Sequence, residues 1–467
     1  MGLKLYNSLS KKTEEFTPIK KGKVGIYSCG PTVYWNQHIG HMYAYANWDV
    51  LVRFLRYSGF DVKWVMNITD VGHMTSDEDI GEDKMEKGAK REGVSVWDIA
   101  EKYIEQFKDS MKLLGISFPD VLCRATENIE EQIALNSLIE KNGYSYLTKK
   151  GLVFDTGKFA DYAKFANLNL DEMKSRDDVE KYQDKKKAWD FFLWAINPKH
   201  AMLWESPWGE GYPGWHIECT AMSTKYLGKK FDIHTGGMEH IGVHHTNEIA
   251  QGFAVFGDMT ANYWLHNSWL TSSGGTKMSK SLGNFVTAQE LVEKGYDPLS
   301  MRYLILTSHY RKGLSFSWEA LDSAQSGLFN LRSLLKSAKN QKSRNTLSDE
   351  KLKKVDEYRK RFVDSLNNDL NTPQALAVLW EVVKSSIPSV DKYELAMSFD
   401  EVLGLKLDQV GTTNKLSGKK QPTKNKDIEK LLKEREKLRE SGDYKKADEI
   451  RDKLVILGYD IKDKPMK

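Results

Sequence analysis

The chain has 467 residues, of which 40% are hydrophobic and 29% are charged. At roughly 150 residues per domain, this length predicts about three domains, with enough apolar residues to build their cores. The longest apolar runs, 191–196 and 375–380, are six residues long, whereas a membrane-spanning helix needs about 20. Three cysteines are too few for a disulfide scaffold. We therefore expect a cytoplasmic protein, not associated with a membrane, whose cysteines are free thiols or metal ligands.

The formal net charge is +4, and its distribution along the chain is uneven. Residues 411–467 hold 17 Lys and Arg against 11 Asp and Glu, a surplus of six, which leaves about −2 for residues 1–410. A basic segment behind a mildly acidic body is typical of a module that binds a polyanion. A solvated lysine-rich helix would have the same charge, so composition leaves both interpretations open.

Strand and helix signals alternate near the N-terminus. Val24–Ser28 predicts a short buried strand, and the apolar periodicity of Ile39–Tyr57 predicts a helix that ends at Ser58-Gly59. Val62–Met66 predicts the next strand. A strand, a helix and a strand over this length form a βαβ unit, which favours an α/β fold with a parallel sheet.

A second region of the same kind follows far along the chain. A strand is predicted at 230–234, a turn at Gly236-Gly237, a helix from about His244, and a strand at 263–268. The intervening segment, 121–199, has its own helix and short strands. We interpret it as a connective insertion between two halves of one catalytic domain, which comprises residues 1–120 and 200–318.

The remaining chain is predicted to be helical. Amphipathic helices follow Trp318, a polar joint lies at 339–349, and a linker rich in Thr, Lys, Ser and Asn covers 412–426. A charged helical pair, joined near Ser441-Gly442, completes the chain. We therefore expect a helical bundle at 319–410 and a small C-terminal module at 427–467.

The first motif with chemical potential is His38-Ile39-Gly40-His41, which follows a strand and opens a helix. The first turn of a helix offers unpaired N–H groups to phosphate oxygens, and Gly40 has no side chain to obstruct their approach. Two histidines three residues apart lie on one face of that turn. A helix start with a structurally satisfied histidine is the alternative interpretation.

The second motif lies in the glycine-bearing segment 271–284. Its residues are Lys277, Met278, Ser279, Lys280 and Ser281. Two lysines on a loop can close over a polyphosphate and neutralise charge on a leaving group. Such a string alone is typical of any solvated loop, but its pairing with the histidine motif on a βαβ sheet is specific.

These two motifs together resemble the ATP-binding signature of class I aminoacyl-tRNA synthetases. The resemblance implies a Rossmann-type domain that activates an amino acid with ATP and transfers it to the terminal adenosine of tRNA. It also implies that His38, His41, Lys277 and Lys280 act in catalysis by stabilising the triphosphate. Gly40, Met278, Ser279 and Ser281 would complete the ATP site, and Mg²⁺ would accompany ATP.

A third group of residues has the chemistry of zinc ligands. Cys29 ends the first strand, Cys219 lies in Gly-Trp-His-Ile-Glu-Cys, and His244 and Glu248 are four residues apart on one helix face. Thiolates, imidazole and carboxylate are the ligands that zinc uses in proteins, and zinc prefers sulfur to a hydroxyl oxygen. Because they are dispersed and lack Cys-x-x-Cys spacing, these four residues are by themselves only weak evidence for zinc.

The surrounding motifs resemble the cysteinyl-tRNA synthetase family over most of the chain. They include Cys-Gly-Pro-Thr-Val-Tyr, Gly-Trp-His-Ile-Glu-Cys, Phe-Asp-Ile-His, His-His-Thr-Asn-Glu and the Asp369-Leu-Asn-Thr-Pro segment. The resemblance implies one zinc ion per chain, held by Cys29, Cys219, His244 and Glu248. It implies a cysteine-binding site formed by Cys29, Gly30, Thr69, Trp215 and His244, and it leaves Cys123 as a buried thiol.

Three departures from the family pattern concern the rim of this site. Tyr43 replaces an arginine, Glu239-His240-Ile-Gly-Val replaces Asp-Leu-x-Phe-Pro, and Val71-Gly-His73 with a longer acidic stretch replaces an acidic-lysine run. His73 and His240 are candidates for extra ligands or for surface residues. None of these changes alters the four proposed zinc ligands or the two signature motifs.

The leading hypothesis is a monomeric enzyme that uses cysteine, ATP and tRNA(Cys), with the helical bundle bracing the tRNA and the C-terminal module contacting its anticodon. One alternative is the related ligase that joins cysteine to an amino sugar. Another is a non-catalytic tRNA-binding paralogue. The signature motifs favour an enzyme, and the helices and basic tail beyond residue 318 favour tRNA as the acceptor.

Overall fold

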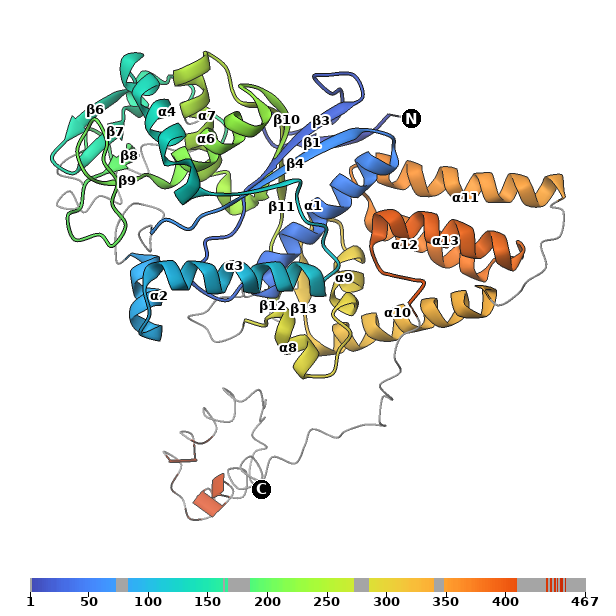
Figure 1. The fold of residues 1–467 in the computed structure, drawn as a ribbon. Coiled ribbons are helices and arrows are strands. Elements are labelled where there is room, and N and C mark those ends of the chain that lie inside the picture. Colours follow the sequence, from blue (N-terminus) through green and yellow to red (C-terminus); the bar gives the residue numbers. More distant parts are fainter. Residues whose placement is uncertain are drawn as a thin grey trace. The chain divides into compact units, whose positions relative to one another are not determined.

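The computed structural model divides into two compact units, residues 1–410 and 411–467. In the first unit the described residues are 2–72, 83–162, 164–166, 185–272, 285–339 and 348–409, and in the second only scattered positions between 434 and 450. Several predictions fall outside these residues: His73, the motif Lys277–Ser281, the linker at 412–426 and most of the charged helical pair. The account below concerns the first unit (Figure 1).

A five-stranded sheet forms the centre of this unit, and all its strands are parallel. The strands run in the order β11-β10-β3-β4-β5. Their bounds are β3 (Lys23–Ser28), β4 (Asp61–Ile68), β5 (Val121–Arg124), β10 (Phe231–Gly237) and β11 (Ala261–Asn267). The parallel sheet predicted from the two strand–helix–strand regions is therefore confirmed, and its two halves meet where β3 pairs with β10.

The strand order reverses at this β3–β10 boundary. From β3 the chain proceeds through β4 to β5 on one side, and the later strands β10 and β11 lie on the other. In open α/β sheets, ligands bind outside the carboxyl ends of the strands at such a switch point. The topology therefore places a binding site after Ser28 of β3 and Gly237 of β10.

Helices cover both faces of the sheet. Helix α1 (Ile39–Tyr57) packs against β4 and β10, and helix α6 (Trp215–Leu227) packs against β3 and β4. Alternate side chains of β3 pack on opposite faces of the sheet. Ile26 belongs to the apolar core on the α1 side, and Tyr27 belongs to the core that contains Cys219 of α6. This period of two is typical of a strand buried on both faces.

Gly236 and Gly237 do not form the predicted turn. Both residues remain in β10, where they pair with His266 and Asn267 of β11. A Cβ atom at Gly236 would lie 2.7 Å from the imidazole Nδ1 of His240 and from Cε1 of His245. The two glycines therefore extend the strand and leave room for imidazole rings, a use of glycine that the local sequence does not distinguish from a turn.

The insertion carries a second, antiparallel sheet. Its strands are β6 (Ser145–Thr148), β7 (Gly151–Phe154), β8 (Phe191–Ala195) and β9 (Tyr212–Pro213), with helix α4 (Ile129–Lys141) beside them. Two strands do not follow the bounds 121–199 predicted for the insertion. Strand β5 lies within these bounds but belongs to the central sheet, whereas β9 lies beyond residue 199 but pairs with β8 of the insertion. A separate apolar core joins this sheet to α6 and helix α7 (His244–Phe256).

The other elements complete the unit. They are β1 (Lys4–Asn7), β2 (Lys12–Glu15), α2 (Lys84–Glu92), α3 (Val96–Leu113), η1 (Ala125–Asn128), η2 (Thr156–Lys158), η4 (Met238–His240), β12 (Leu270–Ser272), α8 (Ala288–Glu293), α9 (Leu299–Leu306), β13 (Leu314–Phe316), α10 (Trp318–Lys339), α11 (Asp349–Asn367), α12 (Thr372–Lys384) and α13 (Ser389–Leu403). The helices predicted after Trp318 are present, and α10–α13 pack together as a bundle (Figure 1).

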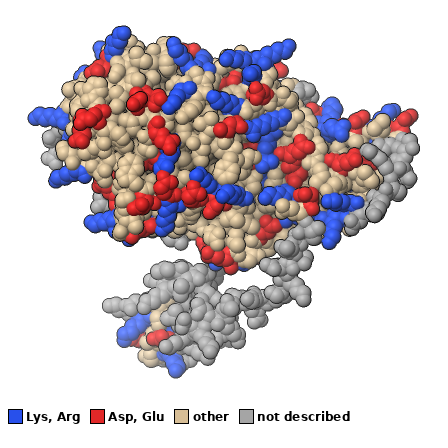
Figure 2. Space-filling model, in the orientation of Figure 1, with Lys and Arg blue, Asp and Glu red and all other residues tan. Residues whose placement is uncertain are grey.

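Surface charge and hydropathy agree with the composition. Lys and Arg side chains are interspersed with Asp and Glu over the face of the first unit seen in Figure 2. No helix in the described part of the chain combines the length and the apolar character needed to cross a bilayer.

A buried arginine ties the bundle to helix α1, which packs on the central sheet. Arg302 of α9 is fully buried; its Nη2 donates to Asp49 Oδ2 of α1 at 2.6 Å, and its Nε donates to the carbonyl of Leu403 at 2.6 Å. Burial alone would raise the pKa of Asp49, but Arg302 and Arg53 hold that pKa below its ordinary value. One ion pair therefore joins α1, α9 and the end of α13.

We expect Arg302→Met to lower the free energy of unfolding by about 3–5 kcal/mol, because it leaves the Asp49 carboxylate buried without its main counter-charge. Urea denaturation monitored by circular dichroism measures this change. Lys23→Met is the matched control, since its partner Asp61 is exposed and such a pair contributes about 0–1 kcal/mol. The double variant Asp49→Leu/Arg302→Met should recover part of the loss; no recovery would mean that the ion pair is not the cause.

Candidate functional site

A cavity of about 520 Å³ opens at the predicted switch point. Its walls come from the segments that follow β3, β4 and β10, from the start of α1 and from α6. Among the lining residues are Cys29, Gly30, His38, Gly40, His41, Thr69, Trp215, Cys219 and His244. Nine predicted site residues, distant in sequence, therefore line one cavity.

The two histidines of the first motif lie at the start of α1. His38 is the N-cap residue, and its Nδ1 accepts the Gly40 backbone N–H at 3.0 Å. The rings of His38 and His41 stack with their centroids 3.8 Å apart. A Cβ atom at Gly40 would lie 2.7 Å from His38 Cε1, so glycine at this position allows the His38 ring to cap the helix.

The second motif, Lys277–Ser281, lies outside the described residues, but its flanks are placed. Trp269 and Leu270, which precede it, line the cavity. On its other side, Thr287 pairs with His38, and the carbonyl of Val286 accepts the Ile39 N–H at 2.7 Å. The backbone on both sides of the motif therefore reaches the cavity or the start of α1.

Two buried thiols meet on the floor of the cavity. Cys29 follows β3, Cys219 lies on α6, and their Sγ atoms are 4.0 Å apart. All three cysteines are free and buried, as predicted. On a tetrahedral zinc ion with Zn–S bonds of about 2.3 Å, two sulfurs lie about 3.8 Å apart, whereas a disulfide requires about 2.05 Å. The thiol spacing fits a shared metal ion.

The carboxylate of Glu248 lies beside these thiols, surrounded by histidines. On α7, the Nε2 atom of His244 is 3.1 Å from Glu248 Oε1, and on β10 the Nε2 atom of His234 is 2.9 Å from Oε2. Glu248 is fully buried. Its ion-pair partners among the described residues are all imidazoles, so no permanently charged side chain there balances this carboxylate.

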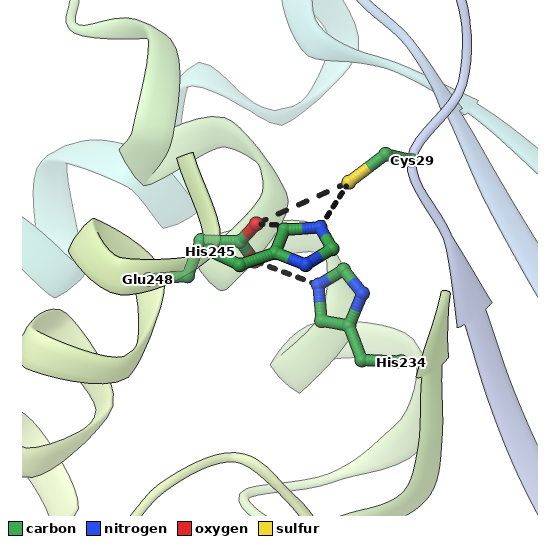
Figure 3. A group of neighbouring side chains, drawn as sticks. All are labelled: Cys29, His234, His245 and Glu248. Atoms are coloured by element: carbon green, nitrogen blue, oxygen red, sulfur yellow. Dashed lines mark hydrogen bonds and ion pairs between the residues drawn. The ribbon is translucent and has the colours of Figure 1, made fainter. Parts of the chain in front are cut away.

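Two overlapping sets of four ligand groups can be formed from these residues. The predicted set, Cys29, Cys219, His244 and Glu248, has its ligand atoms within 4.8 Å of one another. So does a second set, Cys29, His234, His245 and Glu248. Figure 3 shows that second set, with Cys29 Sγ 3.3 Å from His245 Nε2 and His234 directed at Glu248. The donor chemistry of both sets fits zinc.

The sequence interpretation missed His234 and His245. His245 is adjacent to His244, and His234 lies in the Phe-Asp-Ile-His motif that carried the resemblance. They can be recognised as neighbours of Cys29 only when the strand order is known. Strand β10 lies beside β3, so that His234 pairs with Tyr27, two residues before Cys29. His240, a predicted candidate, lines the cavity but belongs to neither set.

Further histidines orient the ligand groups. His216 Nδ1 lies 2.9 Å from His244 Nδ1, and His245 Nδ1 lies 2.7 Å from His266 Nε2. These contacts leave Nε2 of His244 and of His245 directed toward Glu248. A hydrogen bond on one ring nitrogen fixes which nitrogen is available to a metal.

Burial disfavours the charged forms of these groups. It raises the pKa of the thiols of Cys29 and Cys219 and the pKa of the Glu248 carboxyl. Burial also lowers the pKa of His234 to about 3, and that of His245 well below its ordinary value. Neutral imidazoles can ligate a metal directly, whereas the thiols must first lose their protons.

Of the residues that depart from the family pattern, Glu239 and His240 line the cavity, beside Trp215 and Lys84. Trp215 stacks on His244, with ring centroids 4.5 Å apart, and Lys84 lies over the Trp215 ring at 5.7 Å. Glu239 Oε2 accepts the indole N–H of Trp269 at 2.9 Å. Tyr43 is buried inside α1, so the side chain that replaces the family's arginine does not line the cavity.

Comparisons with known proteins identify the class. Residues 15–326 match the model of the class I (C) tRNA synthetase catalytic domain. The fold is similar to that of the methionyl-tRNA synthetase of Mycobacterium tuberculosis, with a TM-score of 0.55 at 15% identity, over 82% of this chain and 90% of that one. The parallel sheet, its switch-point cavity and the start of α1 thus define the catalytic domain of a class I aminoacyl-tRNA synthetase.

The particular family follows from the full-length matches. The chain is 43% identical to the cysteine–tRNA ligase of Treponema denticola, over 100% of this chain and 99% of that protein. It is 45% identical to cysteine–tRNA ligase 1 of Burkholderia lata, over 100% and 96%. Residues 361–386 match a DALR domain and 422–467 a cysteinyl-tRNA ligase anticodon-binding domain. The chain belongs to the cysteinyl-tRNA synthetase family.

The raised thiol pKa values predict proton release on metal binding. At pH 7 both Cys29 and Cys219 are protonated in the metal-free protein, so zinc should displace at least about two protons per ion, and a third from Glu248 wherever its carboxyl is protonated. Affinity should therefore fall as the pH falls, by at least about 10²-fold per unit while both thiols are protonated. Calorimetry in two buffers of different ionisation enthalpy counts the protons, and Cys123→Ser serves as the control. Binding without proton release would exclude the thiols as ligands.

Proposed function

We propose that the chain activates L-cysteine with ATP and transfers the cysteinyl group to the terminal adenosine of tRNA(Cys). The observation that carries this proposal is the juxtaposition in one cavity of the Cys29–Cys219 thiol pair with the His38–His41 helix start. The first is suited to sulfur recognition through a metal, and the second to phosphate binding. Cysteine recognition and nucleotide binding would thus occur side by side.

The ATP site is proposed at the start of α1. His38 and His41 would face the phosphates together with the first-turn N–H groups, and Gly40 keeps that approach open. Lys277 and Lys280 would neutralise charge on the departing pyrophosphate, with Met278, Ser279 and Ser281 completing the loop and Mg²⁺ accompanying ATP. The chain would act by positioning reactants and stabilising charge, which suffices for this reaction.

Zinc is the proposed metal, one ion per chain, with Cys29, Cys219, His244 and Glu248 as its ligands. Bound there, it supplies a Lewis acid that prefers thiolate sulfur to hydroxyl oxygen. The side chains contribute the rest: Trp215 holds the His244 ring in place, and Gly30 permits close packing behind Cys29, since a Cβ atom there would lie 1.6 Å from the Asn67 carbonyl oxygen. Thr69 lines the same cavity.

The acceptor is proposed to be tRNA, not an amino sugar. The match of residues 422–467 to an anticodon-binding domain supports this acceptor. The basic surplus of residues 411–467 also favours a polyanion. A catalytically active monomer in the cytoplasm is the simplest form of this proposal.

Two assays separate the candidate functions. We expect ATP–pyrophosphate exchange that depends on cysteine, which a non-catalytic tRNA-binding paralogue would lack. We also expect a tRNA(Cys) transcript to accept labelled cysteine, which an amino-sugar ligase would not support. Charging should weaken steeply with added salt, because phosphate contacts dominate tRNA affinity. Exchange without charging at any salt concentration would favour the amino-sugar ligase.

Cys219→Ser should remove zinc and thiol selectivity together. Pocket contacts alone discriminate a hydroxyl isostere by only about 10²-fold, so the cysteine-to-serine preference in ATP–pyrophosphate exchange should fall to that level or below. Elemental analysis of the same preparation measures its zinc content. Cys123→Ser is the matched control, because Cys123 is equally buried and belongs to neither ligand set. A zinc-free Cys219→Ser protein that still rejects serine would refute the role of zinc.

A further inference from the structure

Glu218 is a fully buried carboxylate next to the proposed metal site. It lies on α6 between two cavity-lining residues, three positions after Trp215 and one before Cys219. On a helix, positions i, i+3 and i+4 share one face. Glu218 therefore lies on the face of α6 that carries the cavity wall, directly behind the lining residues.

Thr69 connects this carboxylate to the cavity. Thr69 lines the cavity, and its hydroxyl donates to Glu218 Oε2 at 2.9 Å. Asn67 Nδ2 in turn donates to Thr69 Oγ1 at 3.1 Å, while Asn67 Oδ1 accepts the Gly30 N–H at 2.8 Å. The Gly30 contact orients the Asn67 amide so that its NH₂ group faces Thr69.

These contacts fix the polarity of the Thr69 hydroxyl. Its proton is directed at Glu218 and one of its lone pairs is taken by Asn67, so its other lone pair is available to a donor from the cavity. Glu218 lies in the first turn of α6, near the positive end of the helix dipole. The cavity wall at Thr69 thus offers a hydrogen-bond acceptor backed by a buried carboxyl group.

The amino-acid substrate brings a matching group to this place. In cysteine only two carbon atoms separate the sulfur from the α-ammonium group. A thiol recognised beside Cys219 therefore places the ammonium within reach of the wall formed by Thr69 and the adjacent Glu218. An ammonium group has only donors, and in a cavity of low dielectric its attraction to a carboxylate is weakly screened.

We infer that Glu218 is a positioning residue for the α-ammonium group of the amino-acid substrate and acts through the hydroxyl of Thr69. Thr69 Oγ1 accepts a hydrogen bond from the ammonium, and Glu218 holds the threonine proton away from the cavity and supplies the counter-charge. The inference rests on the proposed function. It adds a second recognition point, one that selects an α-amino group and not a thiol.

Three thiols separate this role from metal binding. L-Cysteine has both an ammonium and a carboxylate, cysteamine has the ammonium only, and 3-mercaptopropionate has the carboxylate only. Isothermal titration of the full-length, zinc-loaded protein measures their dissociation constants without turnover. In Glu218→Gln we expect cysteine and cysteamine to bind about 10–100-fold more weakly, the range for a hydrogen bond to a charged group, with 3-mercaptopropionate changed less than about twofold.

Two threonine variants test the relay with little structural disturbance. Thr69→Val keeps the shape but has no acceptor, so it should show the same selective loss as Glu218→Gln. Thr69→Ser keeps the hydroxyl and should recover most of the cysteine and cysteamine binding that Thr69→Val loses. Asp232→Asn is the control for a buried carboxylate: Asp232 accepts the Ile19 and Gly25 N–H groups at the opposite end of β10 and should leave all three dissociation constants unchanged.

The possible outcomes are distinct. Equal weakening of all three thiols in Glu218→Gln, or loss of its zinc, would mean a merely structural role and would overturn the inference. Unchanged binding of cysteine in Glu218→Gln would also overturn the inference, and so would a parent protein that binds 3-mercaptopropionate as tightly as cysteine. In these two cases thiol recognition, and with it the proposed function, would stand. A parent protein that binds none of the thiols would instead refute the proposed function, and the inference with it.

Discussion

The chemistry of this site depends on a buried carboxylate that has imidazoles and thiols, but no Lys or Arg among the described residues, as its close neighbours. Glu248 lies against His244 and His234, with the Cys29 thiol 4.0 Å away. Ionising a buried carboxyl without a counter-charge is costly, so its pKa is raised. These groups could hold a divalent cation, which would offset that cost and favour the ionised thiols as well. Ionising this carboxyl is thus unfavourable without a cation nearby, and it would become favourable around a bound metal ion.

The parallel sheet is what brings these groups together. Cys29 follows β3, His234 lies on the adjacent β10, and α6 and α7 bring Cys219 and Glu248 to the same end of the sheet. The apolar core shared by the insertion, α6 and α7 holds both helices in register. Packing of ordinary aliphatic and aromatic residues thereby sets distances between polar groups that are about 190 residues apart in sequence. Close packing tolerates little displacement, so the geometry of the ligands is determined by the core.

Local patterns in the sequence predicted the parts of the site that depend on local geometry. Helix α1 has the predicted bounds, because its apolar periodicity and the Ser58-Gly59 stop are both local signals. The i, i+4 spacing of His244 and Glu248 likewise follows from helix geometry alone. Gly236 was misinterpreted because a glycine pair is typical of turns, and its actual role, leaving room for His240 and His245, exists only in the folded protein.

The groups that sequence reasoning missed are those whose meaning depends on strand order. His234 becomes a neighbour of Cys29 only when β10 pairs with β3. Glu218 becomes a neighbour of Thr69 only when α6 packs on β4. Their partners lie 205 and 149 residues away in sequence, well outside the reach of any periodicity. The family resemblance supplied Cys29 and Cys219 as ligands, but it carried no information about the second ligand set or about the carboxylate behind Thr69.

The position of Glu218 beside Cys219 has a consequence for specificity. A thiol-selective metal alone would accept any small thiol that fits the cavity. Such thiols include compounds that lack an amino group and therefore cannot form an aminoacyl ester of use to the cell. Glu218, which accepts the hydrogen bond of the Thr69 hydroxyl, and the proposed metal ligand Cys219 are consecutive residues of α6, so one helical turn would fix the spacing of these two groups. A substrate must then present sulfur and ammonium at the spacing of a cysteine to satisfy both. On the proposed function and the inference above, rejection of serine would fall to the metal ligands, and rejection of thiols without an amino group to the Glu218–Thr69 pair, since each buried polar group is costly when its partner is missing.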